Sequence, residues 1–252
     1  MWGSFVFGLG VLIYAAMFDF KHRQVSNRVW LFAYPIGGGL SFLGVGWGLL
    51  GVEAVLVSLG CALGLGVILF FLGFYGGADV KALIFIGLTV PRLPFIFNPV
   101  PGLALAPVLV VFFNATLLTA VWPLSIFILN LKDILKANPL FEGINLSFVQ
   151  KGLVLFTARK VPLDMVGWRY FPAEKIVLQG GNPTRKLCHF VRAEADLSNQ
   201  LAIIEANKAL YQNGVLASPT IPAICFFTLA LGTALFGNLF FWVGALFGTI
   251  SL

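Results

Sequence analysis

The chain has 252 residues, of which 59% are hydrophobic and only 10% are charged, and its mean hydropathy is +0.95. This composition excludes an ordinary soluble domain, because such domains carry about 25% charged residues. Several apolar runs reach the roughly 20 residues that a helix needs to cross the hydrocarbon core of a bilayer. These runs do not alternate as barrel strands do, so we predict an all-α polytopic membrane protein.

The net charge of +6 has a topological explanation. The first apolar run, residues 3–19, is followed at once by Lys21, Arg23 and Arg28. The positive-inside rule puts this basic loop in the cytoplasm and the N-terminus outside. The N-terminus lacks the basic region and cleavage site of a signal peptide, so we expect a retained span. Most other basic residues lie in loops expected to face the cytoplasm, and we expect no nucleic-acid partner.

The second and third apolar runs, residues 29–47 and 49–74, are each long enough to span the bilayer. The second run contains Pro35, which a membrane helix tolerates when its neighbours satisfy the backbone. In the third run, Gly60 and Gly64 have the GxxxG spacing of small-residue packing faces. This spacing favours helix contacts through the two glycines.

The fourth run is short, since it extends only from about Ala78 to Val90. A helix of this length crosses roughly two-thirds of the bilayer, so we expect its start to lie inside the protein. The fifth run covers residues 103–131 and ends at Lys132. It contains three polar residues that we interpret as interhelical hydrogen-bonding groups, namely Asn114, Thr116 and Asn130.

The composition changes between residues 132 and 218, which hold eleven of the sixteen basic and seven of the ten acidic residues. We predict a small soluble α+β insertion on the cytoplasmic side. Its apolar runs at residues 152–156 and 175–178 are interpreted as short strands. Residues 180–183 are interpreted as a turn, and residues 197–212 as a helix.

The last apolar run begins near Pro219 and continues to about residue 250, which returns the C-terminus to the outside. The predicted architecture is therefore six transmembrane helices with both termini outside. Residues 1–131 hold helices 1 to 5, residues 132–218 form the insertion, and residues 219–252 hold helix 6. In this arrangement every lysine and arginine except Arg92 is cytoplasmic.

Only three acidic residues lie outside the insertion, namely Asp19, Glu53 and Asp79. Ionisable groups in or beside the membrane are costly and mark functional sites. Asp19 and Asp79 fall at the same cytoplasmic end, whereas Glu53 falls at the opposite end and is interpreted as an interfacial residue. Two aspartates in a partly dry site do not easily both ionise, so one can polarise a peptide carbonyl while the other activates a water. The pair predicts peptide hydrolysis without a metal, a cofactor or a covalent intermediate.

Two other interpretations of the pair stay open from the residues alone. Each aspartate can instead cap a helix or pair with a neighbouring basic residue. A proton- or cation-coupled transporter also uses paired intramembrane carboxylates. Transporter sites usually lie at the midplane between internal repeats, whereas these acids lie at one face and the sequence has no convincing internal repeat. Metalloprotease and serine-protease chemistry are disfavoured, because the two histidines, His22 and His189, lie outside every span and form no HExxH motif.

Around these aspartates the sequence resembles the archaeal preflagellin and prepilin peptidases, which are membrane aspartic proteases related to the bacterial type IV prepilin peptidases. The first motif of that family is an aspartate that ends the first helix before a basic loop, here Asp19. The second motif is GxGD, which is present here as Gly76-Gly77-Ala78-Asp79. Ala78 stands where the family pattern has its second glycine, and the resemblance covers the membrane part of the chain.

The resemblance implies a membrane-embedded aspartic endopeptidase that removes the short basic leader of archaellin and type IV pilin precursors at the cytoplasmic face. It implies Asp19 and Asp79 as the catalytic pair. Gly76 and Gly77 would let the substrate backbone approach. The implied partners are the precursor proteins and the lipid bilayer.

Two lysines are further candidates for shaping the site. Lys81 follows the second motif and is expected either to tune the charge of the carboxylate or to anchor the helix at the interface, and Lys21 follows the first motif. The insertion has a net charge of eleven minus seven, or +4. We expect it to position a basic leader through local acidic groups, with the candidates Asp164, Glu174, Glu194 and Asp196.

Overall fold

The computed structural model describes residues 1–94, 105–136, 140–167, 169–179, 182–188, 197–211, 214–239 and 242–243. The chain divides into two compact units, and each is described by itself. The first unit combines Met1–Thr119 with Pro222–Leu252, and the second is Ala120–Ile221.

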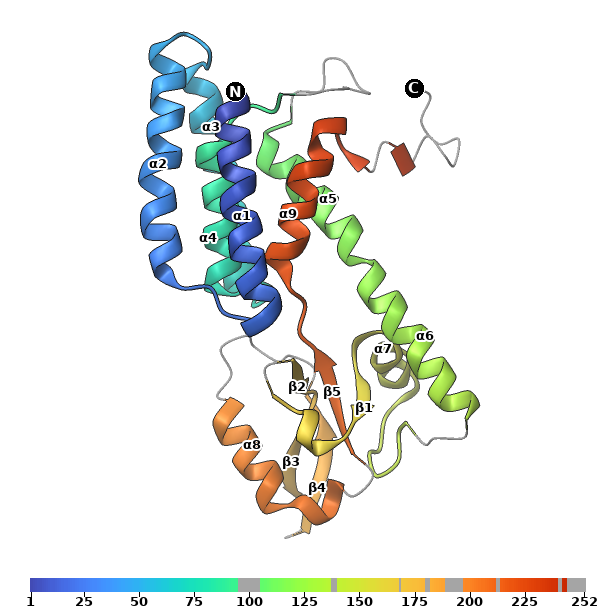
Figure 1. Ribbon diagram of the computed structural model, residues 1–252. Helices are drawn as coiled ribbons and strands as arrows, with labels where there is room; N and C mark the ends of the chain where they lie inside the picture. Colours follow the sequence, from blue (N-terminus) through green and yellow to red (C-terminus); the bar gives the residue numbers. More distant parts are fainter. Residues whose placement is uncertain are drawn as a thin grey trace. The chain divides into compact units, whose positions relative to one another are not determined.

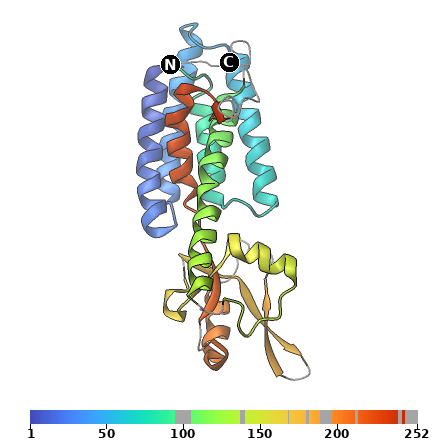
Figure 2. The same ribbon diagram turned by 90° about the vertical axis from the view of Figure 1, so that its right-hand side faces the viewer.

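In the described part of the first unit, α-helices form a bundle (Figure 1). α4 packs against both α2 and α3, and α9 lies between α1 and α5, as a second view also shows (Figure 2). The helices are α1 (Trp2–His22), α2 (Asn27–Gly46), α3 (Val52–Phe71), α4 (Gly77–Thr89), α5 (Pro107–Thr119) and α9 (Ala223–Thr233), and the short 3₁₀ helix η3 (Ala234–Phe236) follows α9.

α4 lies at the centre of this bundle, and beyond Lys81 it is apolar on all sides. Its side chains Leu83, Phe85 and Ile86 have no exposed surface, as expected for a helix that is surrounded by protein. Close contacts with α3 depend on glycine, since a Cβ on Gly87 would lie 2.9 Å from the carbonyl oxygen of Ser58. The small residues of α3 that face α4 are Ser58, Ala62 and Gly66.

The expectation that α3 packs through Gly60 and Gly64 is wrong. Both glycines are exposed, and a Cβ at either position would meet no atom within 4 Å. The face of α3 that contacts α4 instead carries Ser58, Ala62 and Gly66 at intervals of four residues. A GxxxG pair in a chain with 28 glycines is therefore a poor guide to the packed face.

Four helical stretches are long and apolar enough to cross a membrane, which confirms a largely helical membrane protein. They are Trp2–His22, Asn27–Gly46, Val52–Phe71 and Pro107–Leu135, the last of which combines α5 with α6. α4 has 13 residues, as the sequence predicts. α9 has 11 residues, and after η3 the chain turns at Gly237, whose φ is 94°. The last predicted span therefore does not begin as a helix at Pro219, and its second half is not tested, because residues 240–241 and 244–252 lie outside the described part.

The second unit combines helices with short antiparallel strands, as the composition predicts. Its helices are α6 (Val121–Leu135), α7 (Phe148–Thr157), α8 (Leu197–Ala206) and the 3₁₀ helices η1 (Leu163–Met165) and η2 (Lys208–Tyr211). Its strands are β1 (Arg159–Val161), β2 (Tyr170–Pro172), β3 (Glu174–Gln179), β4 (Asn182–Leu187) and β5 (Val215–Pro219). The described strands form a sheet in the order β1-β5-β2 and a β3–β4 hairpin.

Two of the four predicted elements of this unit differ from the structure. Residues 152–156 belong to helix α7 and not to a strand. Asn182 and Pro183 belong to β4 rather than to a turn, since Gln179 pairs with Asn182, and residues 180–181 lie outside the description. The strand at residues 175–178 is confirmed within β3. The helix after residue 196 is confirmed as α8, but it ends at Ala206 and η2 follows.

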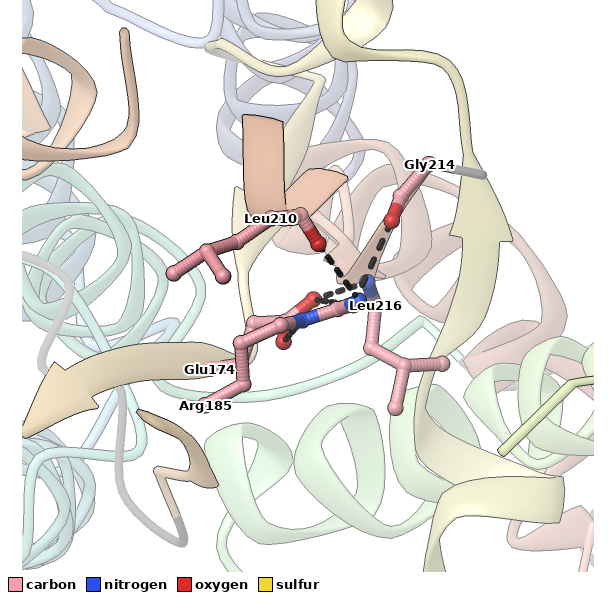
Figure 3. Close-up of polar contacts among 5 residues, drawn as sticks. All are labelled: Glu174, Arg185, Leu210, Gly214 and Leu216. Carbon is pink, nitrogen blue, oxygen red and sulfur yellow. Dashed lines mark hydrogen bonds and ion pairs between the residues drawn. The ribbon is translucent and has the colours of Figure 1, made fainter. Parts of the chain in front are cut away.

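A buried ion pair joins the β3–β4 hairpin to β5 (Figure 3). The side chains of Glu174 and Arg185 are 0% and 6% exposed, and two hydrogen bonds of 2.7 and 2.8 Å connect them. The Glu174 carboxylate also accepts the Leu216 N–H at 2.6 Å. Arg185 further donates to the carbonyls of Leu210 and Gly214 at 3.1 and 3.3 Å. The pair is therefore well satisfied in the interior of the second unit.

The polar residues of the fifth apolar run have different roles. Asn114 of α5 donates to the Thr233 hydroxyl and accepts the Leu239 N–H, so it connects α5 to the end of α9. Asn130 of α6 donates to the carbonyl of Leu155 in α7 and to the carbonyl of Ala158 just after α7. Both confirm the expected interhelical bonds. Thr116 does not, because its hydroxyl donates to the Phe112 carbonyl of its own helix.

Candidate active site

Asp19 lies in the last turn of α1, with its side chain turned into the first unit. The residue is 8% exposed, and its Oδ2 accepts the backbone N–H of Ile224 at 3.2 Å. Ile224 is the second residue of α9, where N–H groups have no partner inside the helix. The start of α9 therefore holds a carboxylate that comes from a helix 205 positions earlier in the chain.

Arg23 ends α1 just beyond this aspartate. Its φ of 55° places it in the left-handed region, and its N–H donates to the Asp19 carbonyl at 2.9 Å. This conformation costs roughly 1 kcal/mol for a residue with a side chain. The Arg23 charge also interacts with the Asp19 carboxylate. The basic loop after α1 thus begins with a turn fixed at the aspartate itself.

Asp79 is the third residue of α4, two positions after Gly77. Its Oδ2 accepts the Gly76 N–H at 3.0 Å, and its own N–H donates to the Gly76 carbonyl at 3.1 Å. A carboxylate in the first turn is favoured by the positive end of the helix dipole. Asp79 therefore caps its helix, and the capping interpretation of this residue is part of its structural role.

The structure brings the two aspartates together. The carboxylates of Asp19 and Asp79 are near enough for a direct coulombic interaction. Two side chains that the sequence analysis did not single out lie beside them. Tyr75 interacts with the Asp79 charge and packs edge-on against Phe227 with ring centroids 5.5 Å apart, and Cys225 interacts with the Asp19 charge. The residues that surround the pair thus come from α1, α9 and the loop before α4.

The structure places Lys81 against α2. Its ammonium donates to Asn27 Oδ1 at 2.7 Å, and its carbonyl accepts the Tyr34 hydroxyl at 2.9 Å. The first turn of α4 is thereby attached to the first two turns of α2. Lys21, by contrast, has an exposed side chain in the last turn of α1.

The two glycines of the second motif leave space beside Asp79. A Cβ on Gly77 would meet no atom within 4 Å, and a Cβ on Gly76 would lie 3.6 Å from Asp79 Oδ2. Gly76 has a φ of −79°, which any residue can adopt, so its own conformation does not require glycine. Because neither glycine has a side chain, this turn leaves open space beside Asp79.

The other acidic residues named in the sequence analysis differ in their exposure and in their partners. Glu53 lies exposed in the first turn of α3, at the end of that helix away from the loop that leads to α4 and Asp79. The prediction that Glu174 attracts a basic leader is wrong, because its side chain is buried and paired with Arg185. Asp164 is exposed. The candidates Glu194 and Asp196 lie outside the described residues.

Two interacting carboxylates that each accept a backbone N–H can share the tasks of acid and base around a water molecule. The amino-acid sequence alone does not indicate that the Ile224 N–H contacts Asp19, since the two residues are 205 positions apart. The available signal was Pro222, which precedes the first turn of α9 and fixes where its free N–H groups begin.

The part of the chain that holds both aspartates is similar to known proteins. A family model described as the type IV leader peptidase family matches residues 6–124, which include both aspartates. The preflagellin peptidase of Methanococcus voltae is 30% identical over 166 residues, which cover 62% of this chain and 70% of that protein. The chain therefore belongs to the type IV leader peptidase family and is similar to the preflagellin peptidases within it.

Proposed function

We propose that this protein is a membrane-embedded aspartic endopeptidase that removes the leader of archaellin or type IV pilin precursors. Asp19 and Asp79 are its catalytic residues. The observation that carries the proposal is that these two carboxylates, which come from separate helices of one bundle, lie near enough to repel each other electrostatically. The name of the Methanococcus voltae relative supports the substrate class.

The proposed chemistry needs one shared proton and one water. Repulsion between the two charges favours a pair that holds a single proton. The protonated carboxyl donates to the oxygen of the scissile carbonyl, while the ionised one removes a proton from the attacking water. The tetrahedral intermediate then collapses, the C–N bond breaks, and the new amine takes a proton from the pair. No covalent enzyme intermediate is formed.

The remaining parts of the site have proposed roles in substrate access. Gly76 and Gly77 leave room for an extended backbone beside Asp79. Lys81 fixes the first turn of α4 through Asn27 rather than tuning the carboxylate charge. Lys21 is exposed and is proposed to face the headgroups beside the site.

We also propose the topology that the basic residues favour. Six spans would place both termini outside, with residues 132–218 as a cytoplasmic insertion between the fifth and the sixth span. The site would then face the cytoplasm, where a short basic leader is retained by the positive-inside rule. Cleavage would occur between this leader and the hydrophobic helix that follows it.

The test is cleavage of a purified archaellin precursor by the full chain in lipid nanodiscs. Asp19→Asn and Asp79→Asn preserve side-chain size and remove the acid and base functions. Each is expected to lower the cleavage rate by about 100-fold or more. Glu53→Gln is the matched control, since it neutralises an exposed carboxylate in the same membrane unit, and it should cleave at the wild-type rate.

Two results would oppose the proposal. One is cleavage by either Asn variant at the control rate. The other is an intact precursor with the wild-type protein while a pH gradient drives solute uptake into proteoliposomes, which would favour a coupled transporter.

A further inference from the structure

α7 carries an apolar face that the rest of the described second unit leaves uncovered. Phe148 is 92% exposed, Val149 70%, Leu153 52% and Phe156 41%. Successive residues of a helix are turned by about 100°, so these four side chains and Gly152 fall within a sector of about 140° on one side of α7. The opposite side contains the buried Val154. Phe156 lies at the edge where α7 packs against α6, so we call the other three residues, Phe148, Val149 and Leu153, the α7 face.

α7 is attached to α6, which belongs to the same unit. The ring of Phe156 stacks on Phe127 with centroids 4.7 Å apart and an interplanar angle of 7°. Asn130, which is fully buried, donates to the carbonyls of Leu155 and Ala158 at 3.0 and 2.7 Å. These bonds satisfy carbonyls at the end of α7 that the helix itself leaves free. The C-terminal half of α7 is thereby fixed against the middle of α6.

The helix to which α7 is fixed is part of a candidate membrane span. α6 forms the second half of the apolar stretch Pro107–Leu135. About 20 residues counted from Pro107 cross the hydrocarbon core, which brings its second edge close to Phe127. The α7 contact with α6 therefore lies at the depth where hydrocarbon gives way to headgroups.

Charged residues around this contact agree with that depth. Lys132 and Lys136 are exposed at the end of α6, and Lys151 is exposed on α7. Lysines beside an apolar face are typical of helices that lie at a membrane surface, because the ammonium groups reach the headgroups while the face enters the acyl region.

From these observations we propose that α7 is an interfacial helix whose exposed face lies in the lipid bilayer next to α6. The occupant of the α7 face is lipid, and not a folded protein partner. The region predicted as a wholly soluble insertion thus begins with a membrane-bound helix. The β-strands and α8 follow this anchor in the chain.

The experiment uses the full chain in nanodiscs of phosphatidylcholine and phosphatidylglycerol. The native cysteines Cys61, Cys188 and Cys225 are replaced by alanine, and one environment-sensitive fluorophore is attached through a new cysteine. Val149→Cys and Phe148→Cys report on the α7 face. Lys186→Cys is the control, because Lys186 is an exposed residue of β4. Quenching by nitroxide-labelled lipid is compared with quenching by aqueous iodide.

The proposal requires that both α7 reporters are quenched by the labelled lipid and protected from iodide, with the reverse pattern at Lys186. Strong iodide quenching at α7 without lipid quenching would overturn it. Protection from both quenchers that is lost on dilution would identify a second copy as the occupant. Protection that develops only when precursor is added would identify the substrate. Each of these last two outcomes also contradicts a lipid-facing helix, and neither depends on whether Asp19 and Asp79 are catalytic.

Discussion

The Lys81 ammonium donates a hydrogen bond of 2.7 Å to Asn27 Oδ1. This bond connects the residue two positions after Asp79 with the first residue of α2. Tyr34, two turns farther along α2, holds the Lys81 carbonyl at 2.9 Å. The turn that carries Asp79 is thus fixed to a neighbouring helix from two sides, by a side chain and by the backbone.

We expect Asn27→Leu and Lys81→Met each to lower precursor cleavage about fivefold. A hydrogen bond of this kind contributes about 1 kcal/mol, which corresponds to that change in rate if the bond holds Asp79 in its reactive position. Asn27→Asp should retain activity, since an aspartate can accept from the same ammonium. The measurement is the initial cleavage rate of each variant in nanodiscs.

The double variant separates a direct bond from two independent effects. If the residues act through one bond, Asn27→Leu with Lys81→Met should lose no more activity than either single variant. Gln24→Leu is the control, because it removes an exposed amide from the same loop. Multiplied losses in the double variant would contradict the shared bond.

The membrane elements and the 13-residue length of α4 were predictable because apolar run length has a direct physical meaning in a bilayer. The sidedness of the basic loops predicted only that Asp19 and Asp79 fall at the same end of their helices, and it left their separation open. The contact of the Ile224 N–H with Asp19 was not predictable, because a single sequence does not show which helix start faces a given side chain.

The strand assigned to residues 152–156 failed for a different reason. A run of five apolar residues fits a buried strand as well as one side of a helix. The decisive signal lay outside the run, where Ser147 accepts the Gln150 N–H and the Gln150 side chain accepts the Ser147 N–H. This capping box marks a helix start at Phe148, four residues before the run that was interpreted.

Gly87→Ala should destabilise the bundle. The new Cβ would lie 2.9 Å from the Ser58 carbonyl oxygen, so α3 and α4 must move apart at a cost of about 1 to 3 kcal/mol. Gly60→Ala is the control on the neighbouring helix, since its Cβ meets no atom within 4 Å. Thermal unfolding in nanodiscs should show a lower midpoint for the first variant alone. Equal midpoints would mean that the α3–α4 contact is looser than described.

Glu174→Ala should destabilise the second unit strongly. It leaves the buried Arg185 charge without its carboxylate and the Leu216 N–H without an acceptor, a loss of about 3 to 5 kcal/mol. Asp133→Asn removes a partly exposed ion pair, in which the Arg159 and Asp133 side chains are 26% and 29% exposed, and should cost under about 1 kcal/mol. Hydrogen exchange of β3, β4 and β5 measures the difference. Unchanged protection in Glu174→Ala would show that the pair contributes little.

Tyr211→Phe tests the aromatic residue over this ion pair. The Tyr211 ring lies 4.7 Å from the Arg185 guanidinium carbon, and its buried hydroxyl has no hydrogen-bond partner among the described residues. Removing the hydroxyl while keeping the ring should leave stability at pH 7 unchanged or raise it by about 1 kcal/mol. Tyr211→Leu, which also removes the ring, should be less stable than Tyr211→Phe.

The stabilities of the wild-type protein and of Tyr211→Phe should differ at alkaline pH. Burial and, to a lesser degree, the Glu174 charge raise the pKa of Tyr211 to about 12. The unfolded chain releases this proton near pH 10 and the folded chain near pH 12, so wild-type stability falls between those values. Tyr211→Phe has no such proton, and its stability should fall less across that interval. Pulse proteolysis of the second unit at pH 9 and pH 11 compares the two. Parallel losses in both proteins would mean that Tyr211 ionises as readily in the folded chain as in the unfolded one.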